Sequence, residues 1–161
     1  FLEKNIDKIL NYDLDVLKRT IKRSCEIKAS VVMQDEKEKG IRKILNYGHT
    51  IGHAIESALN YKISHGQAIA IGMSYAAKLS AKLGFLHEGS VIRQNNLLEY
   101  IGLPHKLSHH QLKPRKILEH IQYDKKIING KINFVLLSSI GDAFISDKVT
   151  LEDIKHILEE K

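Results

Sequence analysis

The pattern of apolar and polar positions predicts a chain built mainly from helices. Residues 1–11 form the first predicted helix, and Asp13 is a candidate N-cap for a longer helix that reaches about Gln34. Thr150 and Asp153 resemble a capping box before the last helix, although Asp stands where Glu or Gln is usual. Apolar spacing and glycine stops predict the helices between these, at about residues 41–59, 66–83, 89–101 and 114–122.

One pair of strands is predicted near the end of the chain. Residues 131–137 (Lys-Ile-Asn-Phe-Val-Leu-Leu) have the character of a strand, and residues 142–146 can pair with them after a turn at 139–141. The sequence contains no repeat, no low-complexity tract and no clear internal boundary. The predicted fold is therefore mostly α, a single multi-helix domain over residues 1–161 with one small β-hairpin.

A lysine interrupts the apolar stripe of the second predicted helix. Lys28 lies seven residues after Ile21 and four before Val32, both of which belong to that stripe. An ammonium group on a core-facing stripe is costly unless it is paired or faces a cleft. Such a lysine also often extends its amine to water. Position alone leaves open whether Lys28 has a functional role.

Composition indicates an ordinary globular protein of 161 residues, with 43% hydrophobic and 27% charged residues. No apolar run approaches the ~20 residues of a membrane span, and no secretory signal is visible. The single cysteine, Cys25, excludes an internal disulfide and a cysteine-based zinc site. We therefore expect a cytoplasmic protein without a membrane partner.

The net charge of +6 admits an anionic partner. Because the lysines are scattered among acidic residues and Trp is absent, a general basic surface or a site for an acidic small molecule is favoured over nucleic acid. The chain starts at Phe1 rather than Met, which is expected for a domain cut from a longer protein.

A ladder of polar residues is the most informative local feature. Arg42, Asn46, His49 and His53 follow one another at steps of +4, +3 and +4. On a continuous helix these side chains would project from one side. A guanidinium, an amide and two imidazoles in line suit a metal and an anionic, hydroxyl-rich ligand, whereas an ordinary amphipathic helix buries Leu and Ile.

The histidine pair of this ladder has the i, i+4 spacing of a zinc chelate. Catalytic zinc usually has three protein ligands, and His65 and Glu56 are both candidates for the third. A pair of hydrogen-bonded structural histidines is the alternative. The remaining histidines, among them His120, share no helical face or ligand spacing and are interpreted as surface residues.

Several residues have the chemistry of anion binding. Arg42 offers a planar fork for carboxylate or phosphate, and Lys28 offers a point charge. Asn46 can donate to a phosphate or to a sugar hydroxyl. Lys125 and Lys126 can add charge to the same pocket, although a solvated turn is the simpler interpretation of that pair.

These residues fall within a longer motif. Residues 42–56 read RKILNYGHTIGHAIE, which closely resembles the 3-dehydroquinate synthase signature RxxLNxGHTxGHAxE. Residues 65–73 resemble the HGEAVAxGM segment of that family, and Lys28-Ala29 and Asp124-Lys125-Lys126 resemble further landmarks. The departures are small: Tyr47 stands where Phe is common, and Gln67 where Glu is common.

The resemblance implies an enzyme with an N-terminal α/β domain that binds NAD and a C-terminal helical domain that carries much of the substrate and metal site. This chain resembles the C-terminal domain alone, so NAD is expected to be bound mainly by the other domain. The implied divalent metal, zinc or cobalt, is held by His49, His65 and a glutamate of the N-terminal domain. His53 then corresponds to a proton-relay and substrate-contact residue, not a ligand. A homodimer is implied for the parent enzyme.

The resemblance also implies a reaction. The sugar phosphate 3-deoxy-D-arabino-heptulosonate 7-phosphate is converted to 3-dehydroquinate and phosphate, a shikimate-pathway step towards chorismate and the aromatic amino acids. Lys28, Arg42 and Asn46 match substrate-binding positions, and one of Lys125 and Lys126 matches another. His53, Lys28 and Arg42 are the expected catalytic residues. The isolated domain is expected to be inactive. A related sugar-phosphate cyclase and a non-catalytic helical module are the alternatives.

Overall fold

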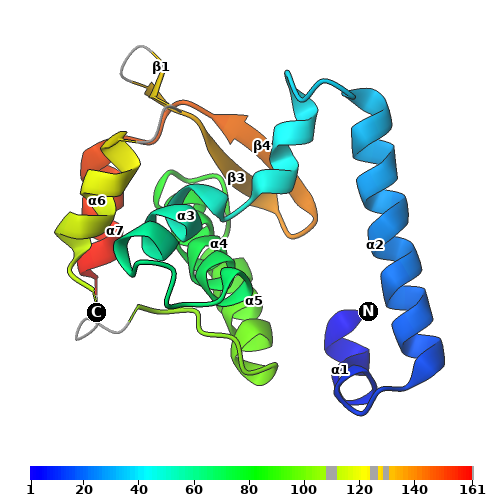
Figure 1. The fold of residues 1–161 in the computed structure, drawn as a ribbon. Helices are drawn as coiled ribbons and strands as arrows, with labels where there is room; N and C mark the ends of the chain where they lie inside the picture. Colours follow the sequence, from blue (N-terminus) through cyan, green and yellow to red (C-terminus); the bar gives the residue numbers. More distant parts are fainter. Residues whose placement is uncertain (108–111, 124–126, 129–130, 161) are drawn as a thin grey trace. The chain divides into compact units, whose positions relative to one another are not determined.

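The computed structural model describes residues 1–107, 112–123, 127–128 and 131–160 (Figure 1). Contacts divide the chain into two compact units, residues 1–45 and 46–161. The expectation of one domain over the whole chain stays a prediction. None of the described helices combines the length and apolar content needed to cross a membrane.

The first unit is built around α1 (Leu2–Leu10) and α2 (Leu14–Gln34), as the sequence predicts. Asp13 is the N-cap of α2, because its carboxylate accepts from the backbone N–H groups of Asp15 (3.1 Å) and Val16 (3.0 Å). The predicted core stripe of α2 is only partly buried. Leu14 and Ile21 are 69% and 61% exposed. Lys28 is exposed as well, so the prediction that it interrupts a buried stripe is wrong.

A carboxylate organises the segment after α2. Asp35 accepts from the backbone N–H groups of Lys39 (3.0 Å), Gly40 (2.7 Å) and Arg42 (3.1 Å). These bonds, chiefly the one from Gly40, lower the pKa of Asp35. The charged stretch after α2 is therefore a defined loop, and it leads into the 3-10 helix η1 (Ile41–Asn46).

The continuous helix predicted over residues 41–59 is wrong. After η1 the backbone turns at Gly48, whose φ is +79°, and α3 (His49–Ala58) starts only there. A left-handed conformation cannot continue a right-handed helix, and glycine adopts it at little cost. The predicted ladder is therefore divided: Arg42 and Asn46 lie on η1, whereas His49 and His53 lie on α3.

The other elements of the second unit follow the predicted order, except that β1 is an additional strand. They are α4 (His65–Lys82), α5 (Glu88–Tyr100), α6 (Pro114–Tyr123), β1 (Ile127–Ile128), β2 (Lys131–Ile132), β3 (Phe134–Ser139), β4 (Asp142–Ser146) and α7 (Leu151–Glu159). The capping box of α7 is confirmed, with Thr150 and Asp153 as partners. The β3–β4 hairpin is confirmed too, in a register that pairs Leu136 with Phe144. The predicted strand at 131–137 is divided, because residues 131–132 pair with β1 instead.

Helix α4 is the centre of this unit and contacts α3, α5, α7 and β3 (Figure 1). Its small residues, Gly72 among them, let neighbours approach closely. Its residue Leu79 is fully buried, together with Ile55, Leu136 and Ile154 of the neighbouring elements. Ser80 joins α4 to the hairpin, because its hydroxyl accepts from the Leu137 N–H at 2.9 Å. The fold is mostly α, as predicted.

Candidate metal and substrate site

Three glycines set the separation of α3 and α4. A Cβ atom on Gly72 would lie 2.0 Å from the backbone oxygen of Gly48 and 2.8 Å from the backbone nitrogen of Gly52. One on Gly48 would lie 2.7 Å from the backbone nitrogen of Met73. The two backbones are therefore in direct contact, a distance that no other residue type permits.

This contact fixes which residues of the two helices face each other. Gly48 lies against Met73, and Gly52 lies against Ile69. Because the helices run in opposite directions, the next turn of α3 faces the first residue of α4, which is His65. The close crossing thus places the start of α4 beside the histidines of α3.

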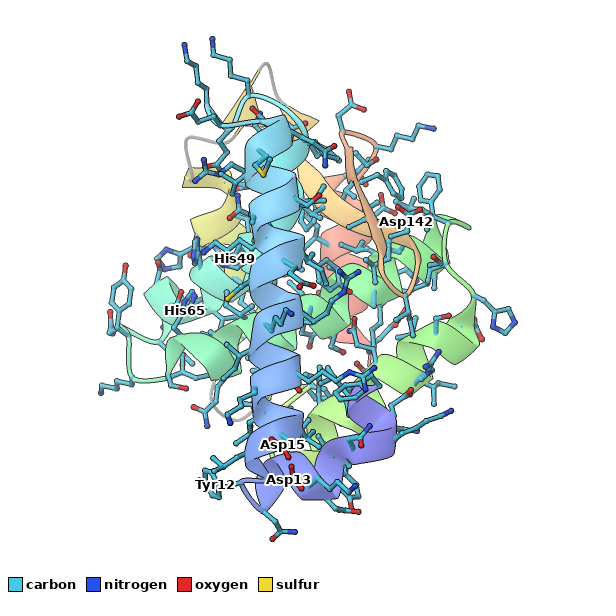
Figure 2. The ribbon with its side chains drawn as sticks, turned by 90° about the vertical axis from the view of Figure 1, so that its right-hand side faces the viewer. Tyr12, Asp13, Asp15, His49, His65 and Asp142 are labelled. Carbon is cyan, nitrogen blue, oxygen red and sulfur yellow. The ribbon has the colours of Figure 1, made fainter. Side chains whose placement is uncertain are left out.

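Three imidazoles meet at this place. The ring centroids of His49 and His53 are 5.2 Å apart, those of His49 and His65 are 5.5 Å apart, and those of His53 and His65 are 5.9 Å apart. Figure 2 shows His49 on α3 and His65 at the start of α4. The structure therefore brings together the histidines that the sequence analysis selected from the nine in the chain.

Hydrogen bonds identify which ring nitrogens can bind a metal. The Nδ1 atom of His49 lies 3.2 Å from the backbone oxygen of Tyr47, and Nδ1 of His65 lies 3.0 Å from Oε1 of Glu56. A carbonyl oxygen or an ionised carboxylate only accepts, so Nδ1 carries the proton in both rings. In each ring the Nε2 atom then keeps its lone pair.

These two rings fit a shared metal ion. An ion bound to Nε2 lies about 3 Å from the ring centroid, so a centroid separation of 5.5 Å suits two imidazoles on one ion. Both rings have their Nδ1 held by an oxygen, as metal-bound histidines almost always do. The His65 side chain is 59% exposed, which leaves its side of the site open to a further ligand.

A second donor set shares one of these histidines. Ligand atoms of His53, Glu56 and His65 lie within 4.8 Å of one another. In this set, however, Nδ1 of His65 and Oε1 of Glu56 are already joined by their hydrogen bond. The second oxygen of Glu56 lies 4.0 Å from Nε2 of His53. The structure thus brings all three histidines together, and the expected binding of one metal ion by His49 and His65 stays a prediction.

Tyr47 anchors the segment that enters α3. Its hydroxyl lies 3.0 Å from the backbone oxygen of Met73 and 2.9 Å from Oε1 of Gln94. Burial raises the pKa of Tyr47 well above its ordinary value, an effect that the Gln94 bond partly offsets. The hydroxyl thus stays protonated at neutral pH, and it fixes the residue whose carbonyl oxygen holds His49.

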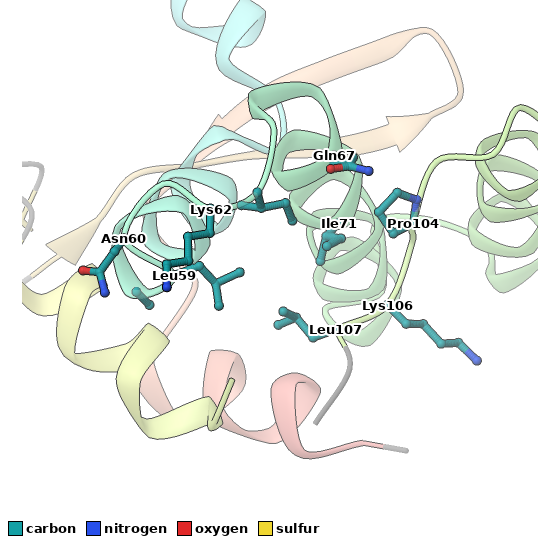
Figure 3. Close-up of a pocket in the computed structure, with 10 residues that line it drawn as sticks. Leu59, Asn60, Lys62, Gln67, Ile71, Pro104, Lys106 and Leu107 are labelled. Atoms are coloured by element: carbon teal, nitrogen blue, oxygen red, sulfur yellow. The ribbon is translucent and has the colours of Figure 1, made fainter. Parts of the chain in front are cut away.

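Cavities lie beside this cluster and elsewhere among the described residues of the second unit. A cavity of about 520 Å³ is lined by His53, Glu56 and His120, among others. His120 is exposed, as the sequence analysis expected of a surface residue, but it also lines this cavity, which no spacing in the sequence indicated. Figure 3 shows a cavity of about 700 Å³ between Leu59, Ile71 and Leu107. None of the three clustered histidines is among its described lining residues.

Residues 1–127 match the model of the 3-dehydroquinate synthase C-terminal family. The chain belongs to this family. It is 48% identical over 161 residues to the 3-dehydroquinate synthase of Thermodesulfovibrio yellowstonii, which covers 99% of this chain and 45% of the relative. It is 44% identical over 159 residues to that of Crocosphaera subtropica, covering 98% and 43%. The chain thus spans less than half the length of these curated relatives.

Solved structures of sugar-phosphate cyclases resemble this member of the 3-dehydroquinate synthase C-terminal family. A 2-deoxy-scyllo-inosose synthase, complexed with carbaglucose-6-phosphate, NAD+ and Co2+, is 32% identical, with a TM-score of 0.77 over 89% of this chain and 41% of that one. A 2-epi-5-epi-valiolone synthase from Streptomyces hygroscopicus, with NAD+ and Zn2+ bound, has a TM-score of 0.77 over 98% and 44%. At 23% identity it shows the fold alone.

The remaining predicted site residues of this family member are distributed over the chain. Asn46 is the last residue of η1 and is half-buried. Lys28 and Arg42 lie in the first unit, whereas the three histidines lie in the second, and a shared site stays a prediction. Lys125 and Lys126 lie outside the described residues.

Proposed function

We propose that this chain is the metal- and substrate-binding part of a 3-dehydroquinate synthase. The reaction converts 3-deoxy-D-arabino-heptulosonate 7-phosphate to 3-dehydroquinate and phosphate in the shikimate pathway, and the enzyme is a carbon–oxygen lyase. The observation that carries the proposal is the cluster of His49 and His65, both with Nδ1 bound to an oxygen, in a chain of this family.

The proposed metal ligands are Nε2 of His49 and Nε2 of His65. A zinc or cobalt ion bound there supplies a Lewis acid that polarises a substrate oxygen. A glutamate from an N-terminal domain is the proposed third ligand, and that domain is also proposed to bind NAD. The Co2+ bound in the 2-deoxy-scyllo-inosose synthase structure supports a divalent metal at this site.

His53 is proposed to move a proton. Its ring lies within 6 Å of both proposed ligand rings, measured between centroids, and it lines the cavity beside them. An imidazole has an ordinary pKa near neutrality, so it can accept a proton from a substrate hydroxyl and return it. His53 is therefore assigned to acid–base chemistry, and the two other imidazoles to the metal.

The cationic residues are proposed to hold the two anionic groups of the substrate, its carboxylate and its phosphate. Arg42 and Lys28 supply the charge, together with Lys125 or Lys126, and Asn46 donates to a hydroxyl or phosphate oxygen. One guanidinium nitrogen of Arg42 donates to the backbone oxygen of Glu36 at 2.7 Å, which orients the rest of its fork. Clamping both ends of the substrate keeps the reacting carbons in place.

A second candidate function is another NAD- and metal-dependent sugar-phosphate cyclase. The 32% identity and TM-score of 0.77 to a 2-deoxy-scyllo-inosose synthase favour this alternative over a non-catalytic helical module. It shares the metal ligands and differs in the sugar phosphate that the anion-binding residues accept. A homodimer stays a prediction for either enzyme.

The test is phosphate release by the complete gene product that contains this chain. The assay supplies 3-deoxy-D-arabino-heptulosonate 7-phosphate, NAD and Zn2+ or Co2+. We expect turnover in the wild type and in the exposed-histidine control His156→Ala, and a loss of at least about a hundredfold in His49→Ala and in His65→Ala. The 161-residue chain alone is expected to give no turnover.

Each other outcome has a definite meaning. Full activity in either ligand variant would show that the metal assignment is wrong. A folded, NAD-bound wild type that releases no phosphate from this substrate but does so from another sugar phosphate would favour the second candidate. No metal dependence with any substrate would favour the non-catalytic module.

A further inference from the structure

We propose that Glu56 is a positioning residue that sets the tautomer of His65 and directs its Nε2 atom to the metal. The first part of this inference concerns only the geometry of the protein. The second part rests on the metal role proposed above for His65.

The hydrogen bond between these side chains is built into the helix crossing. Glu56 is one turn beyond Gly52 on α3, and His65 is one turn before Ile69 on α4, so the backbone contact of the two helices brings them together. Oε1 of Glu56 lies 3.0 Å from Nδ1 of His65. Glu56 is only 9% exposed, which keeps water from competing for this carboxylate oxygen.

The tautomer follows from the roles of the two atoms. An ionised carboxylate has no proton to donate, so the proton of the shared hydrogen bond sits on Nδ1 of His65. The neutral ring then has its lone pair on Nε2. Without Glu56, the ring is free to rotate and to take up the other tautomer, which is unable to bind a metal through Nε2.

The tautomer of His49 is set in the same way, but by a different acceptor. There the acceptor is the backbone oxygen of Tyr47, at 3.2 Å from Nδ1. One ligand is thus oriented by the main chain and the other by a side chain. The side-chain carboxylate is the partner that a substitution can remove.

The second oxygen of Glu56 does not compete with this role. It lies 4.0 Å from Nε2 of His53, beyond hydrogen-bond distance, whereas the contact to His65 is 3.0 Å. Direct ligation of a metal by Glu56 is the alternative arrangement, because its oxygen belongs to the group His53, Glu56 and His65. The experiment distinguishes the two.

The experiment measures the tautomer of His65 in metal-free protein by NMR of 15N-labelled histidine. It uses the complete gene product, with the His65 signals assigned by comparison with His65→Ala. The wild type is expected to have the proton on Nδ1. Glu56→Ala is expected to lose this preference, whereas Glu56→Gln is expected to keep it, because the amide oxygen accepts the same bond. Glu99→Ala removes an exposed helical carboxylate and serves as the matched control.

Metal affinity is the second readout. Glu56→Ala is expected to weaken Zn2+ binding about 10- to 100-fold, the usual cost of losing such a partner. Glu56→Gln is expected to lose at most a few-fold, and Glu99→Ala nothing. Circular dichroism and thermal unfolding establish that each variant is folded.

Three results would overturn the inference. One is a wild type with its proton on Nε2 of His65, which decides the matter even if Glu56→Ala fails to fold. The second is an unchanged tautomer in folded Glu56→Ala. The third is a loss of Zn2+ in Glu56→Gln as large as in Glu56→Ala, because it would identify Glu56 as a direct ligand. Failure of the proposed synthase activity would leave the tautomer result intact, so the two proposals fail separately.

Discussion

The helix pairs α1–α2 and α3–α4 are each joined by a short connection, but they bury very different amounts of apolar surface. In α3 and α4, Ile55 and Ala68 are fully buried. In α1 and α2, Leu2, Leu14 and Ile21 are between 43% and 69% exposed, and Val31 is the one buried residue. The second pair meets through its backbones at Gly48 and Gly72.

This difference explains why side chains at the α3–α4 crossing can be held at fixed distances from one another. Backbone contact leaves little freedom for one helix to slide along the other, because a shift would bring backbone atoms into collision. The α3–α4 crossing therefore fixes the distances between the three histidines. Helix α2 carries Lys28 on an exposed surface, which gives a long cationic side chain freedom to follow an anionic group.

The largest expected effect comes from closing the space at the crossing. Gly72→Ala would bring its Cβ to 2.0 Å from the Gly48 oxygen, so we expect the free energy of unfolding to fall by at least about 3 kcal/mol. Urea unfolding of the complete gene product measures it. Gly66→Ala on the same helix is the control, because no atom lies within 4 Å of its new Cβ. A stability of Gly72→Ala equal to that of this control would contradict the account.

A matched pair of truncations compares the two units directly. Ile55→Ala removes a fully buried side chain from α3 and is expected to cost about 2–5 kcal/mol of unfolding free energy. Ile21→Ala truncates a side chain that is 61% exposed on α2, and its expected effect is within about 0.5 kcal/mol. Chemical denaturation of both variants gives the comparison. Equal losses would mean that α2 is packed against other protein in solution.

Two serine substitutions compare the same units, with a smaller expected change in the free energy of unfolding. The Ser80 hydroxyl on α4 is buried and accepts from the Leu137 N–H, so Ser80→Ala leaves that N–H without its partner. The expected loss is about 1–3 kcal/mol, with faster hydrogen exchange at the Leu137 amide. Ser30→Ala on α2 changes an exposed serine and should be nearly neutral. Unchanged exchange at Leu137 would show that the bond contributes nothing.

The smallest effects concern two carboxylates with lowered pKa values, one in each unit. The Thr150 hydroxyl is the main cause for Asp153, and the Gly40 N–H is the main cause for Asp35. A folded pKa below the unfolded value of about 3.8 stabilises the fold above that pH, and the contribution is lost as pH falls through the folded pKa. Asp153→Asn and Asp35→Asn should each reduce the loss of stability between pH 5 and about pH 2. Urea unfolding across that range measures the effect, and an acid limb as steep as in the wild type would exclude these groups as contributors.

Much of the fold could be predicted from local signals. Asp13 and Thr150 mark helix starts by side-chain chemistry that acts within three residues, and both caps are confirmed. The bounds of α4 and α5 lie within a residue of the prediction for the same reason. Such signals depend only on neighbours along the chain.

The break at Gly48 could not be predicted in this way. A glycine four residues before another glycine is compatible with a continuous helix, and spacing alone favoured one. The decisive contact is between Gly48 and residues of α4, more than twenty positions later. The hydrogen bond between His65 and Glu56 also depends on the contact between α3 and α4. From the sequence, Glu56 was only one of two candidates for a third metal ligand.

The most direct test of the account is a crystal structure of the complete gene product with Zn2+, with the ion located by anomalous scattering. The account predicts a peak about 2.1 Å from Nε2 of both His49 and His65, with Glu56 bonded to Nδ1 of His65 and outside the ligand sphere. A peak bound by His53, Glu56 and His65, with His49 turned away, would contradict it.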